Sequence, residues 1–352
     1  MHRQASNQIK ITIAGCLLAA SCALSFGQRK IIAASLENEA SVELLTGIFI
    51  LGLLFGGLTK DILKSRNAGL IGCMLFFFGV FGEAQLASLY WLIFGGGWVL
   101  AISNGLFSTS DECAAGRWLN FTHAFYRGAG LFILLASPSL HTTKWIGFSF
   151  VLLATLILYF TTQDSETPSP KKITDKVGPK ISWFIALLVS INFLAGATEL
   201  WSEQLFTNTI AIALLKEYDW ILAGMMFLGR LLACTPWFCG PRQLLICSVI
   251  TSLAIFIFPL ATHSLLPIIA MIGAFFSASI FPSVLGWVAS VGGRWRGTLC
   301  GFGQIACMLA APLAVTSSKY ALVPGLSLII ISSYMFWSST MSQRLKHQRS
   351  DL

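Results

Sequence analysis

Two carboxylates and an amide share one helical face inside a long apolar stretch. Glu199 and Glu203 follow Asn192 and Gly196 at spacings of 4, 3 and 4 residues, which places all four on one side of a helix. A charged side chain at the centre of a bilayer costs roughly 2.5–3.5 kcal/mol. We therefore expect this face to line a water-filled cavity, where Glu199 binds a proton, a cation or a polar ligand. Alternatively, Glu199 makes a structural hydrogen bond, and Glu203, nearer the helix end, is simply hydrated.

A second polar face carries a histidine and an arginine. Asn120, His123, Arg127 and Gly130 recur at spacings of 3, 4 and 3 residues within an apolar run. A central arginine needs a carboxylate or several carbonyl groups, and Glu199 or Glu83 are the candidate partners. Histidine is the side chain that most readily changes charge near neutral pH. His123 is therefore either a titrating site residue or a buried histidine with its hydrogen bonds satisfied.

Amide, hydroxyl and indole groups are scattered through other apolar runs. Rings and hydrogen-bonding groups together are typical of sugar-binding sites, although each residue also suits helix packing or the membrane interface. The candidates of this kind are Ser21, Ser25, Gln28, Trp98, Asn104, Trp201, Gln204, Trp287 and Gln304.

One acidic residue stands among basic residues directly after an apolar run. Asp61 is flanked by Lys60, Lys64 and Arg66. We interpret this cluster as a conformational latch, in which the carboxylate holds a neighbouring helix end in one of two states. The alternative is that these charges are solvated in a loop.

Other chemistry has no counterpart in the sequence. The five histidines are widely separated, the nine cysteines lie mostly in apolar runs, and neither a catalytic triad nor a nucleotide or nucleic-acid motif is found. We interpret the cysteines as small core residues rather than disulfides or metal ligands. The sequence thus predicts a protein that is not an enzyme and has no metal, cofactor or nucleic-acid partner.

The elements that carry these residues are long apolar segments. The chain of 352 residues is 55% hydrophobic and only 11% charged, against about 25% charged in soluble domains. A span needs roughly 20 apolar residues. Twelve runs meet this need, at about 11–33, 42–58, 68–86, 88–109, 119–139, 144–162, 181–207, 218–236, 242–260, 265–289, 297–317 and 321–341. The only long polar segment, 163–180, is a linker rich in charge and proline.

The basic residues indicate the orientation of these spans. Five of the 23 Lys and Arg residues fall in predicted outside loops and Arg127 falls inside a span, which leaves 17 on the cytoplasmic side. This asymmetry is what the positive-inside rule predicts when both termini are cytoplasmic. It also explains the net charge of +8 without nucleic acid. We expect a multi-pass protein of the inner or plasma membrane of a cell.

Two halves of the chain resemble each other. Gly56-Gly57-Leu58 matches Gly229-Arg230-Leu231 at an offset of 173 residues, and two glycine pairs, 128 with 130 and 301 with 303, match at the same offset. Six-helix bundles at 1–162 and 181–352, joined by the cytoplasmic linker, form the parallel-repeat plan of secondary transporters.

These features resemble the major facilitator superfamily. The segment 56–66, GGLTKDILKSR, is similar to the signature between the second and third helices of that family. Three stretches are similar to its fucose-permease-like branch: 119–126, LNFTHAFY; 196–199, GATE; and Phe281-Pro282 with the glycines that follow. Arg127 stands where that branch continues with glycines, and the first helix carries no acidic residue.

The resemblance implies an all-α membrane protein with twelve helices in two pseudo-symmetric halves. It also implies a monomeric secondary active transporter that moves a sugar or similar small polar solute by alternating access. Proton coupling through Glu199 is the expected mechanism, and sodium is the alternative ion. Two other functions stay open, namely an efflux permease for amphipathic compounds and a membrane scaffold or sensor that does not transport.

Overall fold

The structure is a computed structural model that describes residues 2–27, 40–82, 85–107, 112–161, 191, 195–196, 219–262, 264–291 and 295–309. Every regular element in these ranges is helical, as expected from the sequence. The helices are α1 (His2–Phe26), α3 (Ala40–Ile62), α4 (Ser65–Phe81), α5 (Gln85–Leu106), α6 (Glu112–Ala136), α7 (Leu140–Thr161), α9 (Asp219–Leu232), α10 (Gly240–Ile257), η3 (Phe258–Leu260), α11 (Leu266–Ser277), α12 (Ile280–Val291) and α13 (Arg296–Leu309).

Six stretches in the described residues are long and apolar enough to cross a membrane. The protein is therefore an integral, multi-pass membrane protein. Ten of the twelve predicted runs fall on described helices, whereas the runs at 181–207 and 321–341 lie almost wholly outside the described residues, as does the linker at 163–180. The count of twelve spans accordingly stays a prediction.

Three of the predicted runs differ clearly from the observed helices. The run at 11–33 corresponds to α1, which begins at His2, nine residues before the predicted start. The run at 265–289 is broken, because α11 ends at Ser277 and α12 begins at Ile280. Pro282 has no N–H to donate to the carbonyl of Ala278, so a continuous helix cannot satisfy that carbonyl here. Helix α6 begins at Glu112, seven residues before the predicted start. Hydropathy missed these first two turns because they carry charged residues.

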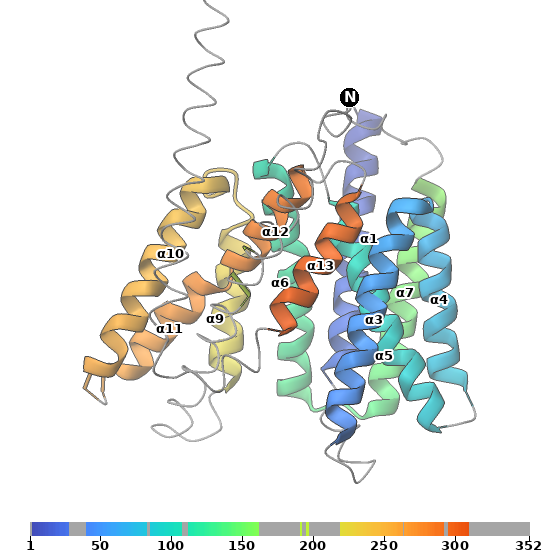
Figure 1. Cartoon of the computed structure of the whole chain (residues 1–352), viewed down its shortest axis with the longest axis horizontal. Helices are drawn as coiled ribbons and strands as arrows, with labels where there is room; N and C mark the ends of the chain where they lie inside the picture. Colours follow the sequence, from blue (N-terminus) through green and yellow to red (C-terminus); the bar gives the residue numbers. More distant parts are fainter. Residues whose placement is uncertain are drawn as a thin grey trace, which may run out of the picture.

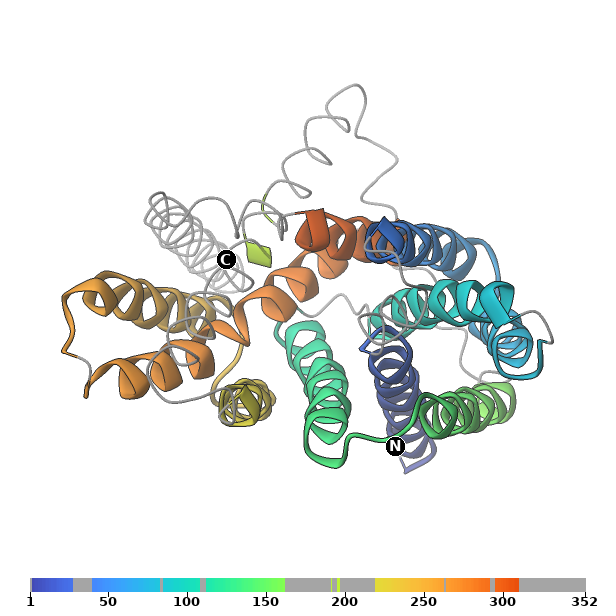
Figure 2. The ribbon, with the colours of Figure 1, turned by 90° about the horizontal axis from the view of Figure 1, so that it is seen from below.

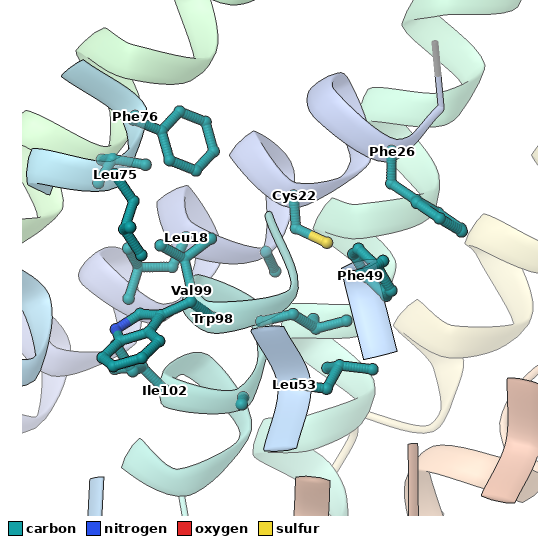
Figure 3. Close-up of a cluster of buried hydrophobic side chains, with 14 of the residues drawn as sticks. Leu18, Cys22, Phe26, Phe49, Leu53, Leu75, Phe76, Trp98, Val99 and Ile102 are labelled. Carbon is teal, nitrogen blue, oxygen red and sulfur yellow. The ribbon is translucent and has the colours of Figure 1, made fainter. Parts of the chain in front are cut away.

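The helices α1, α3, α4, α5 and α7 pack around one apolar core, and Tyr126 of α6 packs against it (Figures 1 and 3). Leu18, Phe49, Phe76 and Val99 are almost fully buried in it. The glycine run at 95–97 lets α5 approach α3 closely, because a Cβ on Gly97 would collide with the carbonyl of Phe49. This agrees with the close helix approach that glycine permits between spans.

The helices α9–α11 form a separate group with its own apolar core, and α12 and α13 run between this group and the first helices (Figure 2). Five helix pairs make the main contacts between the first set, α1 and α3–α7, and the second set, α9–α13: α6 contacts α9, α10 and α12, and α13 contacts α3 and α5. One cysteine corrects the sequence interpretation. Cys239, which precedes α10 outside the apolar runs, is disulfide-bonded.

Candidate functional site

The acidic residue of the predicted latch reaches across to the second set of helices. Asp61 Oδ1 accepts a hydrogen bond from the backbone N–H of Gly297, with a donor–acceptor distance of 2.8 Å. Its Oδ2 accepts from the backbone N–H and the hydroxyl of Thr298, each at 2.7 Å. The first amides of a helix have no partner within the helix, and the helix dipole favours a negative charge there. Asp61 therefore caps the N-terminus of α13.

Glycines make this contact possible. A Cβ on Gly57 would lie 2.7 Å from the carbonyl oxygen of Gly297, and a Cβ on Gly301 would lie 2.9 Å from that of Leu53. The backbones of α3 and α13 thus touch over more than one turn. We call this contact the α3–α13 seam, and the end of the bundle where α3 ends and α13 begins the Asp61 end. The sequence predicts that this end is cytoplasmic.

The three basic residues of the latch cluster differ in their surroundings. The side chain of Lys60 lies beside Gly105 and Gly297, at the α3–α13 seam. Lys64 is exposed. The guanidinium of Arg66 lies 5.9 Å from the ring centroid of Tyr159 on α7, within the first set of helices. The structure therefore brings Asp61 and the stem of Lys60 to α13, and Arg66 to α7.

A second seam at the same end joins α6 to α12. A Cβ on Gly286 would lie 2.6 Å from the N and Cα atoms of Gly116, so the two backbones are in contact. One turn deeper, Asn120 Nδ2 donates to the hydroxyl of Ser283 at 2.9 Å. That hydroxyl donates to Gln243 Oε1 on α10 at 3.0 Å. A chain of uncharged hydrogen bonds therefore crosses this α6–α12 seam.

His123 lies directly behind the α6–α12 seam. Its Nε2 is 3.2 Å from Asn104 Oδ1 on α5, and its ring contacts Phe281 edge to face with centroids 5.9 Å apart. Only 4% of the residue is exposed. In this conformation His123 thus makes a buried hydrogen bond, and water does not reach it. The geometry suits the structural role that the sequence left open beside the titrating one.

The remaining candidates occupy three kinds of place. Arg127 is half-buried one turn beyond His123. Gln304 lies on the same face of α13 as Gly297 and Gly301, which turns it toward the first set of helices. Trp98 instead packs in the core of that set, where its Nε1 donates to the carbonyl of Ala68 at 3.1 Å (Figure 3). This is the packing role that the sequence left open.

The two carboxylates of the predicted polar face, Glu199 and Glu203, lie outside the described residues. Gln28, Glu83 and Asn192 also lie outside them. Gly196 is the described member of that face, and a Cβ on it would lie 2.5 Å from Cys307 Cα on α13. At the level of Gly196 the predicted face therefore packs against α13.

Several buried side-chain polar atoms have no hydrogen-bond partner in the described part of the chain, and three of them belong to amide residues among the site candidates. These three atoms are Asn104 Nδ2, Asn120 Oδ1 and Gln304 Oε1. Each comes from a helix that contacts the other set. These atoms provide one donor and two acceptors that a solute or water can use when the seams part. Among the same residues, no three His, Cys, Asp or Glu side chains gather as metal ligands would.

Sequence reasoning missed one charged residue of the site. The 17 basic residues assigned to the cytoplasmic side include Arg230, yet it falls in the predicted run at 218–236, lies in the last turn of α9 and is only 2% exposed. Its Nε donates to the carbonyl of Ala278, and its Nη1 donates to the carbonyl of His123, both at 2.9 Å. The internal repeat could have indicated this helical position, because Arg230 matches Gly57 of the first half, and Gly57 lies inside a predicted helix.

Comparison with known proteins identifies solved structures that share this fold. The sequence matches none of the protein-family models and none of the curated protein sequences. Solved structures do match: a Major Facilitator Superfamily transporter, FucP, in the outward conformation has 14% identity and a TM-score of 0.66, over 92% of this chain and 97% of that one. A structure of the E. coli fucose:proton symporter has 13% identity and a TM-score of 0.67, over 94% and 97%. The human organic anion transporter MFSD10 has 15% identity and a TM-score of 0.65, also over 94% and 97%.

Proposed function

We propose that this chain, which has the fold of major facilitator transporters, is a secondary active transporter for a small polar solute that works by alternating access. The observation that carries the proposal is the closure of one end. Asp61 caps α13 across the α3–α13 seam, and the α6–α12 seam closes beside it. Polar atoms of Asn104, Asn120 and Gln304 are kept behind these seams without partners among the described residues. If the Asp61 end is cytoplasmic, this conformation is outward-facing.

Asp61 acts in this proposal as the latch of the outward-facing state. Its contacts depend on the two helices touching, so they are lost when the Asp61 end opens. Water can then hydrate the carboxylate, because Asp61 lies at the end of α3. The atoms behind the seams become accessible in the same step. The Asp61 contacts are therefore present in one state, with the Asp61 end closed, and absent in the other, with this end open. Alternating access requires that these two states have similar free energies.

Proton coupling is the second part of the proposal. Glu199 is the proton site, because a carboxylate on a polar helical face can bind and release a proton without any cofactor. Arg127 pairs with Glu199 or Glu83, and His123 is the next candidate for the proton. The fucose:proton symporter among the structural neighbours supports a polar solute and a proton, and the organic anion transporter MFSD10 extends the candidate solutes to organic anions.

Uptake into proteoliposomes tests the proposal. The purified chain is reconstituted and offered a panel of labelled sugars, sugar acids and organic anions, with and without an inward proton gradient. We expect saturable uptake of one class, stimulated by the gradient. Uptake that requires a sodium gradient would replace the proton by sodium. Transport restricted to amphipathic compounds would favour the efflux permease, and the absence of both binding and uptake would favour the scaffold.

A further inference from the structure

A buried guanidinium connects the two sets of helices at the break between α11 and α12. Arg230 reaches from the last turn of α9 to two carbonyl groups, that of Ala278 in the break and that of His123 on α6. Both hydrogen bonds are 2.9 Å long and buried. Arg230 thus links α9, the α11–α12 break and α6 through one side chain.

The sequence explains why the Ala278 carbonyl is available. In a continuous helix the backbone N–H of residue 282 would donate to this carbonyl. Pro282 has no N–H, so the carbonyl is left without its helical donor. Arg230 Nε supplies the missing donor. The arginine therefore satisfies a break that would otherwise bury an unpaired carbonyl, which costs about 1–3 kcal/mol.

The position of this link along the helices separates it from the α6–α12 seam. His123 lies seven residues beyond Gly116 along α6, and Ala278 lies eight residues before Gly286. At 1.5 Å per residue, both carbonyls are roughly 10 Å deeper than the glycine contact. The α6–α12 seam therefore lies between the Arg230 link and the Asp61 end.

We propose that Arg230 is a positioning residue that fixes the pivot of the conformational change. The inference rests on the proposed alternating access. When the Asp61 end opens, the α3–α13 and α6–α12 seams part, while the link from α9 through Arg230 to α6 stays closed. The proline break lets α12 swing about this point.

The contrast between the two charged residues supports this division. Asp61 lies at a helix end, where water can replace Gly297 and Thr298 as donors. Arg230 is enclosed, so parting α6 from α9 would remove the His123 acceptor from a guanidinium that water does not reach. An arginine also keeps its charge at every physiological pH. Breaking the Arg230 link therefore costs more than breaking the Asp61 contact.

Distances between spin labels test the pivot. Labels are attached through a keto amino acid, so that the nine native cysteines stay in place. A pivot pair replaces Phe125 on α6 and Leu228 on α9, and a seam pair replaces Phe55 on α3 and Phe302 on α13; all four side chains are exposed. In Asp61→Asn we expect a second, longer population for the seam pair and an unchanged distribution for the pivot pair. If both pairs lengthen alike, the pivot is not at Arg230.

Substitution of Arg230 provides a second test of the pivot. Arg230→Met should broaden the pivot pair, Arg230→Lys should broaden it less, and Arg242→Met, at an exposed arginine of α10, should leave it unchanged. Adding Pro282→Ala to Arg230→Met restores an N–H for Ala278. The double variant should therefore recover thermal stability while the pivot pair stays broad.

The outcomes of this second test separate the pivot from the latch. An unchanged pivot pair in folded Arg230→Met or Arg230→Lys overturns the inference, and so does a double variant that recovers the native pivot distance. If Asp61→Asn changes neither pair, the proposed latch fails, and the Arg230 variants still decide on the pivot.

Discussion

Replacing Asp61 by asparagine should open the Asp61 end of the protein. The carboxylate accepts three hydrogen bonds from Gly297 and Thr298. An asparagine keeps one oxygen as an acceptor, but its NH₂ group cannot accept from a backbone N–H. The variant therefore loses about one charge-assisted bond and the interaction of the charge with the start of α13.

The size of the shift follows from these contacts. A hydrogen bond to a charged group contributes about 1.5–3 kcal/mol, and a carboxylate at a helix N-terminus adds about 0.3–1 kcal/mol. We expect a net shift of about 2–3 kcal/mol toward the open state, which is roughly a 30- to 150-fold change in the equilibrium. Thr298→Val removes only the hydroxyl donor and should shift it roughly 5- to 30-fold, for about 1–2 kcal/mol.

The assay measures access to a buried position behind the seams. Ser283→Cys is introduced into every variant, and inside-out vesicles are treated with a membrane-impermeant maleimide. Mass spectrometry of the peptide that carries residue 283 distinguishes this label from labels on native cysteines. Where opening equilibrates faster than labelling, the rate follows the open population. Asn67→Ala, which changes an exposed side chain at the start of α4, is the matched control.

The order of the labelling rates tests the proposed latch role of Asp61. We expect Asp61→Asn to react fastest, Thr298→Val to be intermediate, and Asn67→Ala to match the parent. Equal rates in Asp61→Asn, Thr298→Val and the parent would refute the latch and leave Asp61 as a structural cap of α13.

Four further predictions concern the closure, the coupling and the topology. Gly286→Leu should hold the Asp61 end open, because even its Cβ would lie 2.6 Å from the backbone of Gly116; maleimide access at residue 283 measures this, and parent-like access would contradict it. Glu199→Gln should keep downhill exchange of solute but lose accumulation driven by a proton gradient, since it mimics the protonated carboxylate; accumulation with the parent's pH dependence would place the proton site elsewhere. Arg127→Leu should be less harmful to transport when its carboxylate partner is neutralised too, because a lone buried charge is worse than none; additive losses with both Glu199→Gln and Glu83→Gln would argue against an ion pair. A cysteine at position 170 should be inaccessible to impermeant reagents from outside intact cells, and labelling there would reverse the predicted topology.

The sequence predicted the helices and the contact of Asp61 with a helix end because both depend on local patterns. Apolar runs locate spans without any knowledge of their neighbours, and α3, α5 and α7 fall within a few residues of the predicted ranges. An acid after a glycine-rich helix end is also a local pattern. It indicated that Asp61 holds a helix end, but the identity of that end depends on packing between distant segments.

Arg230 and the α11–α12 break depend on contacts that no local pattern contains. The charge of Arg230 indicated the hydrated cytoplasmic side, because a buried arginine is favourable only when distant carbonyls receive its hydrogen bonds. Those carbonyls belong to Ala278 and His123, 48 and 107 residues away. Pro282 is a residue at which a helix can break, but the apolar run at 265–289 is continuous in hydropathy and therefore did not show the break. For Trp98 the sequence left a sugar site and helix packing open, and in the structure the indole packs in an apolar core.

Solute exchange by the reconstituted protein tests the central claim of alternating access most directly. Proteoliposomes are loaded with unlabelled solute of the class that is taken up, and entry of labelled solute is followed at equal pH on both sides. The account predicts saturable counterflow by the parent chain and none by Gly286→Leu, which cannot close the Asp61 end. Equal counterflow by both proteins, or none by the parent with any solute of the panel, would contradict it.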